Sequence, residues 1–301
     1  MKVVATVIML TVLMCATYFL GNWQTSTNRE RFEPLDYWQA GEYAKSFESS
    51  GAYLQKSPMD YFFLTVHGYS AYQLAFSQIK ASEMVRYIDE SISSLRKAIL
   101  TPDGMQDGRV YYVLGKAYYF KGVEYADCCV EYLKKAQAHS WKANDMAEFL
   151  GLSYARLGDY RASVAAFAEA LNTAGENPPA TLLLAIARSY IELREDAIAE
   201  SYLIQCLETG RDIDVTVETR LLLGKIMRER AEYDAAEKHY LAILDEAGEI
   251  AAARHELGEL YLAQGDIARA RSEWRRANRI DPAYAPSIAR INERNPNLQD
   301  D

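Results

Sequence analysis

The chain has 301 residues and a formal net charge of −9, with 50% hydrophobic and 25% charged residues. This acidic balance disfavours nucleic acid as a partner, because contacts to phosphates need clustered lysine and arginine. The hydrophobic and charged fractions are those of an ordinary globular array.

Residues 3–20 form an uncharged apolar run directly after Lys2. These 18 residues are enough for a marginal membrane-spanning helix and exceed the apolar core of most signal peptides. No small-x-small cleavage site follows, so we expect residues 1–21 to remain as a transmembrane signal-anchor. A removed signal peptide or a lipid anchor on Cys15 is the alternative. The layout favours a single pass through a bacterial cell inner membrane with the soluble domain in the periplasm, and the alternative is a lipoprotein or a secreted protein.

Residues 22–34 are mostly polar and are expected to form a linker. From residue 35 to residue 107, apolar and aromatic side chains recur at helical spacing, which predicts degenerate helical repeats. Residues 41–58 fit the second helix of a pair whose first helix is missing or replaced. A long helix over 59–78 then precedes a partner helix that starts near Tyr87, with an insertion at 77–83.

A clearer pattern follows from residue 108 onward. The stretch 146–175, MAEFLGLSYARLGDYRASVAAFAEALNTAG, contains two amphipathic helices around a turn at Gly158. The same pattern recurs, and its copies align on one small residue each, in steps of 36, 36, 37 and 34 residues: Gly115, Gly151, Ala187, Gly224 and Gly258. A period of this length is typical of a helical repeat array.

The copy that ends at Pro282 has the most complete pattern: Leu257, Gly258, Tyr261, Gly265, Ala270, Trp274, Ala277 and Pro282. From about Gly108 to Pro282 the chain therefore resembles a tetratricopeptide repeat (TPR) protein, although Ala187 replaces the usual Gly and Met227 the usual Tyr. The resemblance implies an all-α fold, a right-handed superhelix of antiparallel helix pairs (an alpha solenoid), with about five repeats over 108–282. Residues 283–301 are expected to form a capping helix and tail, in which Ile288 and Ile291 cover the last repeat and Arg290 faces water.

Motifs for chemistry are absent from the sequence. The four histidines show no metal-ligand spacing with cysteine or acidic residues, and no G-x-S-x-G or phosphate-binding loop occurs. Cys128, Cys129 and Cys206 are expected to pack in the core. We therefore expect no enzyme activity, with no catalytic residue, no metal and no cofactor.

The TPR resemblance implies a concave groove, lined by the first helix of each repeat, that holds a peptide of a partner protein. It places these partner-binding residues on the groove: Arg109, Tyr112, Lys116, Tyr119, Phe120, Arg156, Arg188, Lys225 and Arg228. A basic row in an acidic protein predicts an acidic or carboxylate-bearing partner segment. The row equally fits a solvated face in which these residues pair with Glu148, Glu192 and Glu229. Tyr112 and Tyr119 are expected to be more exposed than the tyrosines that precede them.

Two classes of function remain. The first is a membrane-tethered scaffold or adaptor for protein-protein interaction in a cell-envelope assembly. The second is a small-ligand binding module accessory to a transporter, with an enclosed cavity lined by tyrosines of residues 37–132. The basic row favours the adaptor.

Overall fold

The computed structural model describes residues 29–78, 80–210 and 212–293. This part of the chain holds 15 α-helices and no strand, so the all-α prediction is confirmed. The chain divides into two compact units, Met1–Gly158 and Asp159–Asp301, which we call the N-terminal unit and the C-terminal unit. The division falls inside the predicted repeat 146–175, in the turn between its two helices.

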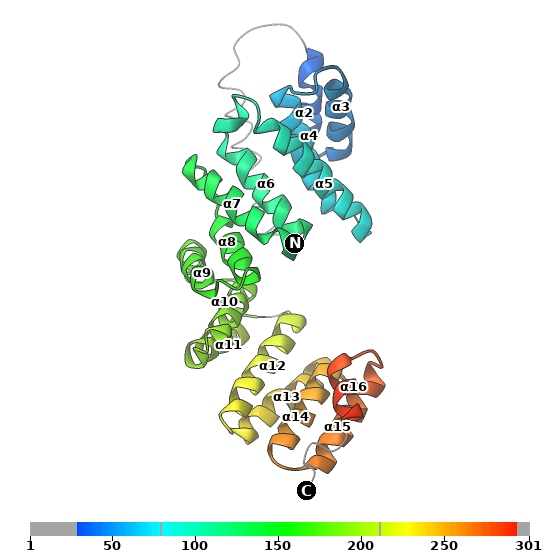
Figure 1. Ribbon diagram of the computed structural model, residues 1–301, viewed down its shortest axis with the longest axis vertical. Coiled ribbons are helices and arrows are strands. Elements are labelled where there is room, and N and C mark those ends of the chain that lie inside the picture. The colour runs from blue at the N-terminus through cyan, green and yellow to red at the C-terminus, as the bar shows by residue number, and fades with distance from the viewer. Residues whose placement is uncertain (1–28, 79, 211, 294–301) are drawn as a thin grey trace. The chain divides into compact units, whose positions relative to one another are not determined.

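The N-terminal unit is a stack of antiparallel helices joined by short turns, in which each helix packs on its neighbours (Figure 1). Its helices are α2 (Arg29–Gln39), α3 (Tyr43–Lys56), α4 (Tyr61–Ala75), α5 (Ala81–Ala98), α6 (Gly108–Lys121), α7 (Ala126–Ala138) and α8 (Met146–Arg156). The first helices of successive pairs also touch one another, because α4 contacts α6 and α6 contacts α8. These contacts place α4, α6 and α8 along one face of the unit.

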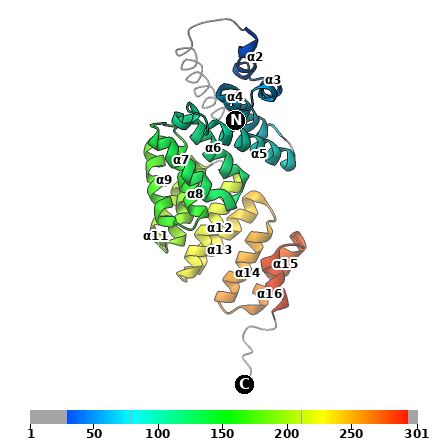
Figure 2. The same ribbon diagram turned by 45° about the horizontal axis from the view of Figure 1, so that its top comes forward.

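The C-terminal unit repeats the same arrangement, as Figure 2 shows for α12 to α16. Its helices are α9 (Tyr160–Ala174), α10 (Ala180–Glu192), α11 (Asp196–Thr209), α12 (Ile213–Glu229), α13 (Tyr233–Ala247), α14 (Ala251–Ala263), α15 (Ile267–Ile280) and α16 (Ala285–Asn292). Contacts between α10 and α12, and between α12 and α14, again align the first helices along one face.

The small residue of each repeat lets the two helices of a pair approach closely. A methyl group added to Gly258 would overlap the indole of Trp274, and one added to Gly224 would overlap the ring of Tyr240. Where the chain has Ala187 instead of glycine, the residue at the matching position of the partner helix is the smaller Leu203, and both are fully buried in one core cluster. In each of these repeats, the size of the residue on the first helix is therefore matched to the size of the side chain that packs against it from the second helix.

The N-terminal end of the array differs from the prediction. Helix α2 begins at Arg29, inside the stretch expected to be a linker, and supplies the first helix that the repeat at 41–58 was expected to lack. It packs on α3 and α4, and the Ser46 hydroxyl of α3 donates a hydrogen bond to the carbonyl oxygen of Pro34 at 2.7 Å. Likewise α5 begins at Ala81, so residues 81–83 of the expected insertion belong to a regular helix that starts six residues before Tyr87.

The capping helix α16 is present, but two of its residues lie differently from the prediction. Arg290 turns toward the array and binds the Glu259 carboxylate through its Nε and Nη2 at 2.7 and 2.6 Å. Ile291 is exposed. The helix is therefore held on α14 by the ion pair between Arg290 and Glu259, and it also packs on α15.

No helix in the described part of the chain is both long and apolar enough to span a membrane. The predicted signal-anchor, residues 1–21, lies outside the described residues.

The turns within repeats provide a stability prediction. Gly265 occupies the left-handed region with φ of 83°, whereas Arg194 and Ala231 occupy the same place in their repeats with φ of 61°. Only glycine adopts this conformation without strain from its side chain. We expect Arg194→Gly and Ala231→Gly each to raise the free energy of unfolding by about 0.5–1 kcal/mol, and Gly265→Ala to lower it by about 1 kcal/mol. Denaturant unfolding of the three variants measures these changes, and a stability loss in both glycine variants would refute the strain at these turns.

Candidate functional site: the faces formed by the first helices

The predicted basic row is largely paired inside the C-terminal unit. Arg188 on α10 forms an ion pair with Glu218 on α12. Arg228 on α12 pairs with Glu256 and Glu259 on α14, at 3.3 and 3.8 Å. The acidic partners come from the next first helix along the array, and they are not the glutamates that the sequence suggested. These pairs stabilise the contact between repeats and reduce the positive charge available to a ligand.

The carboxylates at the end of this face are also largely satisfied. Glu259 accepts the two hydrogen bonds from Arg290, and the phenol of Tyr240 lies 3.5 Å from Glu256. Burial raises the pKa of the Glu256 carboxyl, and Arg228 opposes that rise. In this unit Lys225 is the member of the basic row that is exposed and has no ion pair with another described residue. Of the predicted row, the C-terminal unit therefore offers one basic side chain without an ion pair among the described residues.

In the N-terminal unit, Lys116 is held by its own structure. Its Nζ lies 2.7 Å from the Asp145 carboxylate and 3.2 Å from the Tyr112 hydroxyl, and 4.6 Å from the centre of the Phe149 ring. Tyr112 donates a hydrogen bond of 2.5 Å to the same carboxylate. Lys116, Tyr112 and Asp145 thus join α6 to the start of α8.

Two of the predicted groove residues are not on the surface. Tyr112 is 8% exposed, as buried as Tyr111, so the expectation that it is the exposed member of the pair is wrong. Burial raises the pKa of its phenol, and the neighbouring Asp145 adds to the rise. Arg109 is 6% exposed and binds Asp107 through Nε and Nη2. Both residues are therefore buried within the unit and are not presented on its surface.

Five aromatic rings from α4, α6 and α8 meet on this face of the N-terminal unit, and we call them the aromatic surface: Tyr72, Phe76, Tyr119, Phe120 and Phe149. Phe76 is 46% exposed, and the other four rings are half-buried. The Phe120 ring centre lies 4.7 Å from that of Phe76 and 5.7 Å from that of Phe149. Tyr119 lies 5.0 Å from Phe149, edge to face. Exposed, contiguous aromatic rings are typical of anchors in protein interfaces.

Two of these five rings were predicted from the sequence. Tyr119 and Phe120 were predicted from the first-helix pattern, and the structure places Phe76 and Phe149 against them. A signal for Phe76 was available, since Tyr72 and Phe76 are four residues apart and share a helical face. Phe149 lies directly before Leu150, where Leu or Ile recurs in each repeat, and it gave no separate signal.

Charged groups border the aromatic surface on α8. The Arg156 guanidinium lies 3.6 Å from the centre of the Tyr119 ring, and its Nη1 donates to the Tyr119 carbonyl oxygen at 2.7 Å. Glu148 is half-buried, and no ion pair or hydrogen bond links its carboxylate to another described residue. Burial raises the pKa of Glu148, and Asp145 adds to the rise.

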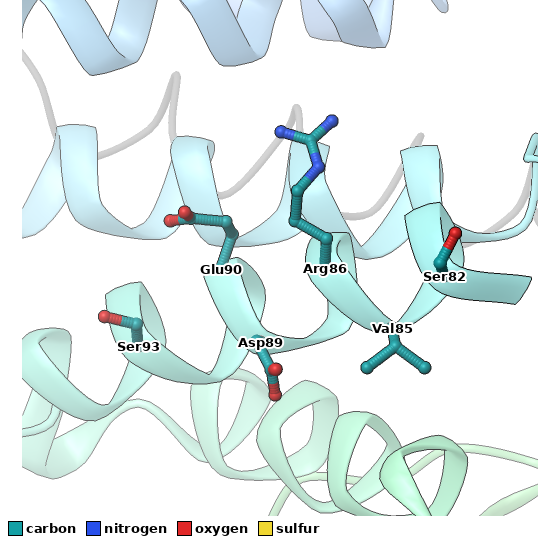
Figure 3. A pocket seen from close by; sticks show the side chains of 6 residues that line it. All are labelled: Ser82, Val85, Arg86, Asp89, Glu90 and Ser93. Atoms are coloured by element: carbon teal, nitrogen blue, oxygen red, sulfur yellow. The ribbon is translucent and has the colours of Figure 1, made fainter.

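Figure 3 shows a shallow depression elsewhere on the N-terminal unit, along the exposed face of α5. It is lined by Ser82, Val85, Arg86, Asp89, Glu90 and Ser93. Asp89 is bound by Lys121 at 2.9 Å. All six residues come from one helix and none is a tyrosine, so this depression is not the enclosed tyrosine-lined cavity that a small-ligand module needs.

Other candidate groups lie in the core or are scattered. Cys129 and Cys206 are buried, as predicted, and burial raises the pKa of the Cys129 thiol to about 11. Within the described ranges no three residues among His, Cys, Asp and Glu are grouped to hold a metal ion.

This chain is similar to known proteins in its structure and not in its sequence. No protein-family model matches the sequence, and no curated protein is significantly similar to it. The C-terminal part of a TPR repeat-containing protein from Cytophaga hutchinsonii is 13% identical with a TM-score of 0.61, over 88% of this chain and 100% of that one.

Two further solved structures are similar. PilW, a type IV pilus biogenesis factor, is 14% identical with a TM-score of 0.59, over 74% of this chain and 98% of its own. YrrB, a TPR protein with an unusual peptide-binding site, is 18% identical with a TM-score of 0.50, over 66% of this chain and 98% of its own. The predicted resemblance is thereby confirmed at the level of structure, and the chain has the fold of TPR repeat proteins.

Proposed function

We infer that this protein is a non-enzymatic scaffold that binds a segment of another protein on the aromatic surface of its N-terminal unit. The observation that carries this proposal is the contrast between the two faces. In the C-terminal unit, ion pairs between helices occupy Arg188, Arg228 and Glu259 on the face of the first helices, whereas the aromatic surface of the N-terminal unit has exposed and half-buried rings. Tyr119, Phe120 and Arg156 contact the partner, while Tyr112 and Lys116 join α6 to α8 through Asp145, and Arg109 is buried at the start of α6.

An acidic partner segment is weakly supported, because Lys116, Arg188 and Arg228 are each paired with a carboxylate. Lys225 is exposed and has no ion pair with another described residue, so a basic contact at this position of the C-terminal unit stays a separate prediction.

We assign the scaffold to a bacterial cell-envelope assembly. Support comes from the apolar run at residues 3–20 and from the fold shared with PilW, which is described as a pilus biogenesis factor. In this proposal the run anchors the protein in the inner membrane, and the two units lie in the periplasm. A cleaved or lipidated amino terminus places the same units on the same side of that membrane.

The test replaces one exposed ring and leaves the fold intact. Because Phe76 is exposed, Phe76→Ser should change stability little but remove a central anchor. We expect it to weaken capture of the crosslinked partner from native membranes by at least about tenfold. Leu241→Ser on α13 is the matched control, since Leu241 is 47% exposed in the other unit. Equal capture by both variants would contradict the assignment of the aromatic surface.

A further inference from the structure

The half-buried carboxylate of Glu148 is an unusual feature of the aromatic surface. Partial burial makes an ionised carboxylate costly unless a cation accompanies it. The nearby Lys116 ammonium is already held by Asp145 and Tyr112. Lys116 lowers the pKa of Glu148 from a distance, but its ion pair is with Asp145, so Glu148 has no ion pair of its own within the described part of the N-terminal unit.

Arg156 lies on the same helix as Glu148, α8, and carries the opposite charge. Its guanidinium stacks on Tyr119 and uses one of its nitrogens on a backbone carbonyl, and it has no ion pair with a described carboxylate. Arginine carries five N–H donors, so donors remain for a ligand. Both charges act on one ring, because Arg156 lowers and Glu148 raises the pKa of Tyr119, whose net rise is due mainly to burial.

Helix geometry places the two charges at opposite ends of one stripe. With 3.6 residues per turn, Glu148, Leu152, Arg156 and Phe149 fall within an arc of about 100° on α8. Glu148 and Arg156 are eight residues apart, which corresponds to about 12 Å along the helix axis. The rings of Phe149, Tyr119 and Phe120 lie beside this stripe.

We propose that the aromatic surface binds an extended segment of the partner that contains a basic, an apolar and an acidic residue, in that order. One residue of any type separates each from the next. The basic side chain binds Glu148, the apolar side chain packs on the rings, and the acidic side chain binds Arg156. In an extended chain, side chains at every second position point the same way, and four residues span about 13 Å. This span matches the rise along α8 between residues 148 and 156. The inference rests on the proposed function and adds the charge order of the partner.

Four short synthetic peptides, acetylated and amidated at their ends, test the inference on the full-length protein. Each has phenylalanine at the centre, arginine or glutamine two residues to one side, and glutamate or glutamine two residues to the other. Binding is measured by fluorescence anisotropy of a labelled amino-terminal spacer. We expect the peptide with both charges to bind at least about tenfold more tightly than the peptide with none, since each satisfied charge adds a few-fold or more.

The variants Glu148→Gln and Arg156→Gln assign each charge. Glu148→Gln should abolish the preference for arginine and keep the preference for glutamate, and Arg156→Gln should do the reverse. Thermal unfolding verifies that both variants are folded, and Glu148→Asp is a second variant that should retain part of the arginine preference.

The outcomes separate the inference from the proposed function. If all four peptides bind equally and Phe76→Ser weakens all of them, the aromatic surface is a binding site and the charge pattern is wrong. If an arginine preference persists in Glu148→Gln, the assignment of Glu148 is wrong. If none of the peptides binds and the partner is still captured from membranes independently of Phe76, both proposals are wrong.

Discussion

Replacing Asp145 with alanine is expected to lower the free energy of unfolding by about 2–3 kcal/mol, because it removes two charge-assisted hydrogen bonds and leaves a partly buried ammonium without its counter-ion. One carboxylate oxygen of Asp145 accepts from Tyr112 at 2.5 Å, and the other accepts from Lys116 at 2.7 Å. The side chains of Lys116 and Asp145 are 16% and 29% exposed, so water screens the pair only in part.

The loss of unfolding free energy in Asp145→Ala would measure how much this contact between α6 and α8 contributes to stability. Although Asp145 stands at the N-cap of α8, its side chain makes no capping hydrogen bond there, so the alanine variant removes no cap. Asp145→Asn keeps an acceptor for Tyr112 and should lose less. Glu131→Ala, which breaks an exposed ion pair with Lys135 within α7, is the control and should cost less than about 0.5 kcal/mol. If Asp145→Ala costs no more than Glu131→Ala in denaturant unfolding, Lys116 is not a structural residue.

Because Lys116 is structural, reversing its charge is a poor test of partner binding. Lys116→Glu would place a second carboxylate beside Asp145, so lost partner binding in that variant reflects a disturbed surface. Lys225→Glu, which alters an exposed side chain, is the cleaner test of a basic contact.

Gly258→Ala is expected to destabilise the C-terminal unit by about 2–3 kcal/mol, near the upper end for overpacking of a closed core. The added methyl group would approach Cδ1 of Trp274 to 2.5 Å, and Trp274 is 2% exposed, so the indole has little room to move. Chemical denaturation of wild type and variant measures the difference.

The chain itself suggests the compensating change. At the equivalent positions of another repeat, Ala187 is buried in the same core cluster as Leu203. Trp274→Leu alone should leave a cavity, and its combination with Gly258→Ala should be less destabilising than the sum of the two single variants. Additive losses would show that the two side chains do not limit each other.

Much of the fold was predictable because the close approach of helices leaves a mark in the sequence. The small residue, the large residue that packs against it and the turn glycine recur at fixed distances, and TPR structures confirm the architecture they predict. Helix α2 escaped detection because Pro34 and a polar composition hide its period, and its docking depends on a hydrogen bond to a backbone carbonyl.

Whether each predicted site residue is buried, paired or free to bind was less predictable from the sequence. The first-helix pattern identified which residues share a face, but it could not show which charges were already paired. Asp145 lies in the connection before α8, outside any repeat position, and its carboxylate decides that Lys116 and Tyr112 are structural. Pairing partners of Arg188 and Arg228 lie on the next first helix, so they depend on how successive repeats pack.

Site-specific photocrosslinking in native membranes tests the central claim most directly. A photoreactive phenylalanine analogue is placed at Phe76 on the aromatic surface, and in a separate protein at Leu241, an equally exposed apolar site in the C-terminal unit. The proposed scaffold predicts a covalent adduct with a partner protein from position 76 and none from position 241. An adduct from position 241 alone, or equal yields from both positions, would contradict binding at the aromatic surface.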